Sequence, residues 1–452
     1  MRNKELLLVV LAFVWLLLNH FHLGSEDLTW GFLALSGAAL VAHLWQDGGR
    51  WQMGMVYLVV ICLVISHVAS ISLPSSTLRW VLFVLGLIGL LLSGALAYLL
   101  PVFALPKPTG SFSLLADLRQ TTSGLEYKIW MPVQALPAKA KRARYHPQPS
   151  RAFQGVMGMP GFVFSHLKTI RTHANQWPVS HRATERFPLV IYSHGASSTL
   201  VDNTVLLEDL ASQGYAVVAL NHGFSFERYD IDAQLARKME VAAQTQLIDT
   251  LVSRVVPNQV NQYQDLVADL EQNYAEGIDF SRIGILGHSL GGATATSGAL
   301  QLPQVQAVVN MDGPIDPAIT QDYPCPLLYF SSFSPELTDE ELKKFRVPPA
   351  FYRGVKRYEL KPVEAIYQTP SEHRYWARFP QANHLDFTDS PFLLPLLGGR
   401  GYDRLAGHQA KAQAVSFFFD QHLKGLDRTL PQEDANWTWL VTPKHSPAPS
   451  VE

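Results

Sequence analysis

The chain has 452 residues, enough for more than one domain, and its 36 Lys and Arg nearly balance its 38 Asp and Glu. This near-neutral charge gives no electrostatic basis for binding nucleic acid. The two cysteines, Cys62 and Cys325, argue against a disulfide framework and do not identify the cellular compartment.

Charge is nearly absent from the first hundred residues. Four apolar runs cover about residues 6–23, 28–45, 54–73 and 80–104, and none contains Asp, Glu, Lys or Arg. Each run is close to the ~20 residues that a helix needs to cross a bilayer. A cleaved signal peptide would account for the first run alone. We therefore expect a transmembrane domain of about four helices over residues 1–105. Because the first two runs contain polar residues, the alternative is that one of these two is an interfacial helix.

Basic residues between these runs indicate an orientation. Arg2, Lys4, Arg50 and Lys107 fall on the side of the N-terminus, and Arg79 falls on the other side. Because cytoplasmic loops carry the excess of Lys and Arg, four spans place the large domain in the cytoplasm. The orientation reverses if one run does not span. The polar residues within the runs, His43, Ser66 and His67, are expected to pack or hydrogen-bond between helices.

A linker is expected over 106–124, where Pro106, Pro108 and Gly110 interrupt regular structure. Apolar residues alternate over 125–131, as in a first strand. Four basic residues between 139 and 144 then precede an apolar stretch over 153–164. This region either rests on anionic lipid headgroups or forms a solvated loop.

The next segments alternate between strand and helix. Strands are expected at 189–192 and 215–220, with a helix over 201–212 between them. This order is typical of a parallel sheet with helical crossovers. Helical patterns over 233–255 and 260–272 form an insertion above or beside the sheet. Strands at 305–311, 326–333 and 375–379 and a closing helix at 409–423 complete a catalytic domain over 125–430, and residues 431–452 form a C-terminal tail.

The sequence over 283–295 has the pattern of a nucleophile elbow. A short apolar strand leads into Gly287-His288-Ser289-Leu290-Gly291, and small residues begin a helix after it. The two glycines let strand and helix approach closely, which exposes the Ser289 hydroxyl at the carboxyl edge of the sheet. The alternative is a glycine-rich turn whose serine caps the helix.

A serine nucleophile needs a base and an acid, which follow it along the chain in this fold class. The histidines after Ser289 are His373, His384, His408, His422 and His445. Of these, His384 falls in the loop between the last strand and the last helix, where the base belongs. Position along the chain does not decide which residue is the acid. Asp312 ends one expected strand, and Glu336 and Asp339 follow the next. Asp386 is expected to structure the loop of His384.

An oxyanion hole takes one N–H from the residue after the nucleophile and one from the loop after an early strand. These positions are Leu290 and Ala196. His194 is expected to order the second loop, His288 to pack beside the elbow, and His222 to line the pocket.

The motifs at 187–195, 209–215 and 285–294 resemble the plasma-type platelet-activating factor acetylhydrolase family. The resemblance spans roughly residues 125–423 and excludes the apolar runs. It implies an α/β-hydrolase fold, a mostly parallel sheet flanked by helices, and it favours Asp312 as the acid and His384 as the base. The chain departs from the family around Ala196 and Leu290 and over 334–372, which leaves the acyl pocket undefined.

Together, the apolar runs and the elbow predict a membrane-anchored serine esterase that uses Ser289, His384 and Asp312 and requires no metal or cofactor. The implied substrates are phospholipids with a short or oxidised sn-2 acyl chain. The alternatives are a general short-chain ester or polyester hydrolase and a non-catalytic lipid-binding membrane protein with a hydrolase-like domain. Ser289 at the elbow excludes a cysteine-dependent hydrolase of the dienelactone type, and the sequence indicates no oligomeric state.

Overall fold

The structure is a computed structural model. It describes residues 3–442 except 24, 70–74, 138, 154–158, 178–184, 236–237, 239, 320–321, 333–337, 345–347, 368–370, 395–396 and 400. Glu336, His445 and part of the apolar stretch 153–164 therefore lie outside the described residues, as do residues 443–452.

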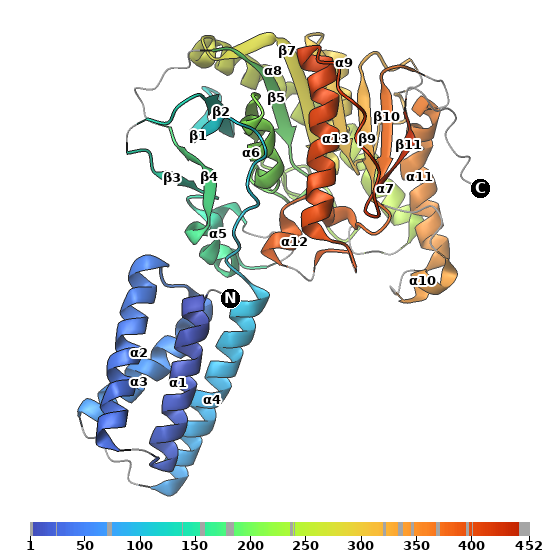
Figure 1. Cartoon of the computed structure of the whole chain (residues 1–452). Coiled ribbons are helices and arrows are strands. Elements are labelled where there is room, and N and C mark those ends of the chain that lie inside the picture. The colour runs from blue at the N-terminus through green and yellow to red at the C-terminus, as the bar shows by residue number, and fades with distance from the viewer. Residues whose placement is uncertain are drawn as a thin grey trace.

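The first hundred residues form a bundle of helices (Figure 1). The helices are α1 (Asn3–Phe21), α2 (Glu26–Gln46), α3 (Gly54–Val68), which follows the short η1 (Trp51–Met53), and α4 (Ser76–Leu99). Leu8, Trp15 and Val60 are buried in the bundle, whereas Leu85 and Leu91 on its outer surface are 56% and 65% exposed. All four helical segments are long and apolar enough to cross a membrane, and the outward leucines are what a lipid environment requires.

Arg50 connects α1 to the residue after α4 at the end of the bundle that faces the second domain. Its guanidinium lies 2.6 Å from the carboxylate of Glu5 on α1, and both side chains are buried. The same guanidinium donates to the carbonyl of Leu100 at 2.8 Å, just after α4. The first helix therefore starts, and the last one ends, at the same end of the bundle (Figure 1).

One mixed sheet forms the centre of the second domain. Its strands are β1 (Ser113–Gln120), β2 (Glu126–Val133), β3 (Arg142–Arg144), β4 (Arg171–Gln176), β5 (Phe187–Ser193), β6 (Ala216–Leu220), β7 (Ile278–His288), β8 (Val305–Met311), β9 (Leu327–Ser331), β10 (Arg374–Arg378) and β11 (Thr438–Val441). Among the described residues the strand order is β11-β10-β9-β8-β7-β5-β6-β2-β1-β4-β3. The run from β6 to β10 is parallel, so the carboxyl ends of these strands meet at one edge.

Helices cover both faces of the sheet. They are α5 (Pro149–Ala152), η3 (Gly161–Thr169), α6 (Thr204–Ser212), α7 (Val241–Thr250), the π-helical η5 (Leu251–Val255), α8 (Val256–Tyr274), α9 (Leu290–Gln301), α10 (Asp339–Lys344), α11 (Pro349–Tyr367), η6 (His384–Phe387), α12 (Ser390–Leu393) and α13 (Arg404–Lys424). One core joins the sheet to α6 and α13, and the other joins it to α8, α9 and α11. The two cores alternate along β5, where Val190 faces the first and Ile191 the second. This arrangement confirms the expected α/β-hydrolase fold.

The edges of the sheet differ from the expectation. The expected linker 106–124 contains β1, which pairs antiparallel with β2, and the expected tail 431–452 contains β11, which pairs antiparallel with β10. Neither segment shows a long alternation of apolar residues that would predict a strand. Each forms a strand because it pairs with the neighbouring strand of the sheet. Part of the basic cluster is likewise the strand β3, so this part is not a loop.

The expected helical insertion is also arranged differently. Residues 241–274 form one continuous helical stretch with a π-helical turn before Pro257, which is tolerated in the first turn of α8. Most of α8 packs on a face of the sheet, whereas Ile231, Leu247 and Val255 pack against Leu290 beside the elbow. The part of the insertion next to the site is therefore the stretch that precedes α8, together with Val256 and Val260 at the start of α8.

Candidate active site

Ser289 stands at the turn between β7 and α9. Its backbone has φ +56° and ψ −124°, a conformation that L-residues rarely adopt outside strained turns. A Cβ added at Gly287 would lie 1.9 Å from the carbonyl oxygen of Gly291, and one at Gly291 would lie 2.1 Å from that of Ser193. Both positions therefore require glycine, as the elbow pattern predicts.

Asp312 and His384 meet at the same edge of the sheet. The Nδ1–H of His384 donates to Asp312 Oδ2 at 2.7 Å. The backbone N–H and the hydroxyl of Ser332 donate to the two oxygens of the same carboxylate at 2.8 and 2.7 Å. The side chain of Asp312 is 5% exposed and that of His384 is 42% exposed. The buried carboxylate thus orients an accessible imidazole, whose Nε2 is left as the acceptor.

The other candidates occupy different places. Asp339 begins α10 and is exposed, and Glu336 lies outside the described residues. His373 precedes β10, and both His408 and His422 belong to α13. The structure therefore brings Asp312 to His384. Sequence reasoning missed Ser332, whose only signal was its position just after a strand of the parallel run.

His288 links the loop of His384 to the elbow. Its Nε2–H donates to the backbone carbonyl of His384 at 2.9 Å, and the two imidazole rings lie 4.6 Å apart. Burial, with a smaller contribution from His384, lowers the pKa of His288 to about 3. The ring is therefore neutral at physiological pH and places no charge beside the exposed imidazole.

The backbone of Ser289 is joined to the strand that carries Asp312. The Ser289 N–H donates to the carbonyl of Met311 at 3.0 Å. Because Met311 precedes Asp312 and His288 bonds to His384, the three candidate catalytic residues come from neighbouring loops at one edge.

The expected oxyanion positions flank the elbow. Leu290 is the first residue of α9, so its N–H has no acceptor within the helix. A Cβ at Gly195 would lie 3.1 Å from Ser289 Cβ, which shows how closely the loop of Ala196 approaches the nucleophile position. Two backbone segments whose N–H groups can donate hydrogen bonds thus lie beside Ser289.

Two buried histidines hold the loop of Ala196. The Nδ1–H of His194 donates to the carbonyl of Gly195 at 2.8 Å, and its Nε2 accepts from the backbone N–H of His222 at 3.2 Å. The Ser193 hydroxyl lies 2.8 Å from His222 Nε2. Burial lowers the pKa of His194 to about 4 and that of His222 to about 3. His194 therefore orders the loop as expected, whereas the expectation that His222 lines the pocket is wrong, because it is fully buried in this network.

Asp386 structures the loop of His384, as expected. Its Oδ2 accepts from the backbone N–H groups of Asn383 at 2.8 Å and Gly399 at 2.7 Å. In the part of the chain that the structure describes, no three His, Cys, Asp or Glu side chains gather as a metal site would require.

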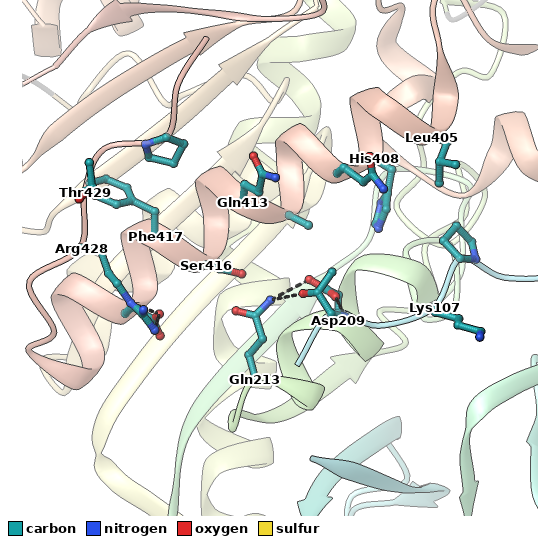
Figure 2. Close-up of a pocket in the computed structure, with 16 residues that line it drawn as sticks. Lys107, Asp209, Gln213, Leu405, His408, Gln413, Ser416, Phe417, Arg428 and Thr429 are labelled. Carbon is teal, nitrogen blue, oxygen red and sulfur yellow. Dashed lines mark hydrogen bonds and ion pairs between the residues drawn. The ribbon is translucent and has the colours of Figure 1, made fainter. Parts of the chain in front are cut away.

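One recess lies away from the elbow. Figure 2 shows it between the segment that leaves the bundle, α6 and α13, with Lys107, Gln213, His408 and Arg428 around it. In its wall, Asp209 accepts from the side-chain amide of Gln213 at 2.8 Å. None of the candidate catalytic residues lines this recess, so it is not the site described above.

Comparisons with known proteins agree with the α/β-hydrolase fold. A family model described as "alpha/beta hydrolase fold" matches residues 188–394. A platelet-activating factor acetylhydrolase of Canis lupus familiaris is 26% identical in an alignment 256 positions long that covers 50% of this chain and 53% of that protein. The chain thus spans about half the length of this relative. A probable 1-alkyl-2-acetylglycerophosphocholine esterase of Arthroderma benhamiae is 24% identical over 49% of this chain and 62% of its own length.

A solved structure shares the fold. A ferulic acid esterase from Streptomyces cinnamoneus superposes with a TM-score of 0.51 at 24% identity, covering 75% of this chain and all of that one.

Proposed function

Because the chain belongs to the α/β-hydrolase superfamily and is related to platelet-activating factor acetylhydrolases, we propose that it is a membrane-anchored serine esterase. The proposed substrates are phospholipids with a short or oxidised sn-2 acyl chain. The names of the two curated relatives support this class of substrate. The observation that carries the proposal is the 2.7 Å contact between His384 and Asp312 beside the strained elbow of Ser289.

The proposed reaction proceeds through an acyl-enzyme. The Ser289 oxygen attacks the ester carbonyl carbon while His384 Nε2 accepts the hydroxyl proton, and Asp312 stabilises the resulting imidazolium. The N–H groups of Ala196 and Leu290 stabilise the tetrahedral oxyanion. The ester C–O bond then breaks, and His384 returns the proton to the leaving alcohol. Water, deprotonated by His384, attacks the acyl-enzyme and releases the carboxylic acid and free Ser289.

The helical bundle supports the proposed membrane anchor. Four helices of sufficient length and hydropathy precede the catalytic domain, and α1 begins beside that domain. Arg2, Lys4, Arg50 and Lys107 then share its side of the membrane, with Arg79 opposite. By the excess of positive charge, we place the catalytic domain in the cytoplasm.

The test compares purified wild type with Ser289→Ala. The substrates are phosphatidylcholines that differ only in sn-2 chain length, with an aryl acetate alongside. We expect serine-dependent release of short sn-2 chains, little release of long ones, and a loss on the order of a thousandfold or more in Ser289→Ala. Ser297→Ala, on the helix α9 that follows Ser289, serves as the matched control.

The other outcomes select between the alternatives. Turnover of the aryl ester alone would favour a general short-ester or polyester hydrolase, a reading that the fold shared with a ferulic acid esterase also admits. Undiminished activity in Ser289→Ala would refute the assignment of the nucleophile. No turnover of any ester by wild type would favour a non-catalytic lipid-binding protein.

A further inference from the structure

Basic residues are concentrated in one segment of the second domain. Residues 127–184 contain nine of the chain's 36 Lys and Arg and none of its 38 Asp and Glu. The rest of the chain carries 27 basic residues against 38 acidic ones. A strongly positive segment in an otherwise acidic protein creates a local field that attracts a partner of negative charge.

Most of these basic residues are exposed on one lobe. The basic lobe is the described part of residues 139–176, which holds β3, α5, η3 and β4. Within it, Arg142 donates to the carbonyl of His173 at 2.8 Å and so helps to hold the two strands together. The other exposed basic residues of the lobe are Lys139, Lys141, Arg144, Arg151, Lys168 and Arg171. Their segment contains no acidic residue that could neutralise them.

The basic lobe packs against the end of the helical bundle. Trp51 donates its Nε1–H to the carbonyl of Val163 at 3.3 Å, and the side-chain amide of Gln52 lies 3.0 Å from His166 Nδ1. The helix η3 thus packs on the connection between α2 and α3, and Figure 1 shows β4 and α5 beside that end of the bundle. The Trp51 ring lies 5.5 Å from that of Phe162, which is 57% exposed. Tryptophan beside exposed apolar surface is typical of the boundary between bilayer and water, where lipid headgroups lie.

Two arginines of the basic lobe lie opposite each other. Arg144 on β3 and Arg171 on β4 are partners in the antiparallel register, and both are exposed. Like charges at opposite positions of two strands destabilise the pair. Within the described part of the chain neither arginine forms an ion pair. Of the acids beside these strands, Glu208 is buried and accepts from two backbone N–H groups of β4 at 2.8 and 3.0 Å, and Asp117 on β1 pairs with Arg119 at 2.8 Å.

An external anion is therefore what this pair of arginines lacks. A phosphate in front of the two guanidinium groups would offset their repulsion, and phosphate is a group that arginine binds in a bidentate manner. The bundle holds the basic lobe at a lipid surface, so the phosphates within reach are those of lipid headgroups.

We propose that the basic lobe binds the headgroups of anionic phospholipids in the leaflet next to the catalytic domain. The inference rests on the membrane anchor of the proposed function and not on the esterase reaction. Binding at the lobe gives the catalytic domain a second attachment to the membrane besides the four helices. Figure 1 shows α12, which follows the loop of His384, on the side of the sheet that faces the bundle. The second attachment therefore holds the edge that carries the candidate active site toward the bilayer.

The first test measures whether lipid covers the lobe. The full chain is placed in nanodiscs of phosphatidylcholine alone or with added phosphatidylglycerol, and exposed lysines are methylated with formaldehyde and a neutral borane reductant. Mass spectrometry gives the methylation rates of Lys139, Lys141 and Lys168 relative to Lys361, an exposed residue of α11 at the other end of the sheet. We expect the relative rates of the three lobe lysines to fall severalfold in the anionic discs and to recover at high salt.

A double variant distinguishes binding from mere proximity to negative charge. Arg144→Gln with Arg171→Gln leaves the lysines and the bilayer in place, so we expect the lobe lysines to react alike in both discs. The matched control, Arg186→Gln with Arg428→Gln, removes two exposed charges outside the lobe and should keep the wild-type protection. Equal lysine rates of wild type in both discs, or protection that persists in the lobe variant, would overturn the proposal.

A second measurement separates this inference from the proposed function. The full chain in a neutral detergent is titrated with phosphatidylglycerol or phosphatidylcholine, and bound lipid is counted by native mass spectrometry. We expect the affinity for phosphatidylglycerol to fall on the order of thirtyfold in the lobe variant, the factor that two basic residues near a lipid surface supply, with phosphatidylcholine binding unchanged.

The outcomes of this titration stand apart from catalysis and from membrane insertion. Unchanged phosphatidylglycerol affinity in the lobe variant would overturn the lobe proposal even if the chain is an active esterase. A chain that hydrolyses no ester, or that does not enter nanodiscs, would refute the proposed function, and the titration would still decide whether the basic lobe binds anionic lipid.

Discussion

At the scale of single residues, the side chains of Asp312 and His384 differ in how far they are exposed to solvent. The carboxylate accepts from Ser332 twice and from His384 once and is almost fully buried, whereas the imidazole is 42% exposed. A buried acid that receives these hydrogen bonds is held in place, and the exposed base is accessible to substrate. This division of roles is the one that a serine nucleophile requires of its partners.

Asp312→Asn tests this role directly. The amide keeps the shape of the side chain but no longer stabilises the imidazolium or its tautomer, so we expect kcat to fall on the order of a thousandfold with little change in KM. Steady-state kinetics on an aryl acetate measures both constants. Asp339→Asn, the same change at the other described candidate for the acid, should retain wild-type kcat. Equal losses in the two variants would contradict the assignment.

His408 offers a test of how burial couples to pH. Burial, with a smaller contribution from Lys411, lowers the pKa of this ring to about 3. Below about pH 6.5, His408 therefore binds a proton in the unfolded chain but stays neutral in the folded protein. As a result, the free energy of unfolding falls as the pH drops from 6.5 toward 3. His408→Gln removes this contribution to the pH dependence of the free energy of unfolding. Relative to wild type, we expect the variant to gain about 1–2 kcal/mol of stability between pH 7 and pH 5.

The measurement is the denaturant midpoint of both proteins in detergent at the two pH values. His373→Gln, at an exposed histidine, controls for the loss of an imidazole outside the core. If wild type and His408→Gln lose stability in parallel as the pH falls, the ring does not stay neutral in the folded protein.

At the scale of elements, the elbow depends on contact between three backbone segments. A Cβ at Gly291 would meet the carbonyl oxygens of Ser193 at 2.1 Å and of His194 at 2.7 Å. Gly291→Ala must therefore displace the loop of Ala196 from the start of α9. Since a displacement of about 1 Å costs on the order of a hundredfold in rate, we expect at least that loss in kcat/KM on an aryl acetate.

The control for this change is Gly94→Ala in α4, where an added Cβ meets nothing within 4 Å. It should be fully active. Wild-type activity in Gly291→Ala would mean that catalysis does not depend on the present position of the loop of Ala196.

At the scale of the whole molecule, the proposed membrane anchor predicts a topology. The link between α1 and α2 lies at the end of the bundle away from the catalytic domain (Figure 1). In a Cys62→Ser background, we expect Leu23→Cys to react with an impermeant maleimide in sealed cells. Thr122→Cys, in the turn between β1 and β2, should react only after permeabilisation, because the catalytic domain is placed in the cytoplasm. The reverse pattern would place that domain outside, and reaction of both sites in sealed cells would mean that α1 does not span.

The sequence by itself determined the features that depend on neighbouring residues. The four apolar runs, the elbow around Ser289 and the alternation of strand and helix are all visible in contiguous segments, because helix and strand periods and glycine turns are local properties. The order of Ser289 and His384 along the chain likewise followed from the position of each beside an expected element. The fold class was predictable for the same reason.

Only the tertiary structure decided which distant segments meet. It placed Asp312 against His384, 72 positions away in the chain, where position alone had left Asp339 equally open. It turned parts of an expected linker and tail into β1 and β11, since edge strands are defined by the partners they pair with. Pairing and packing across long separations are set by the whole core, so no local pattern in the sequence records them.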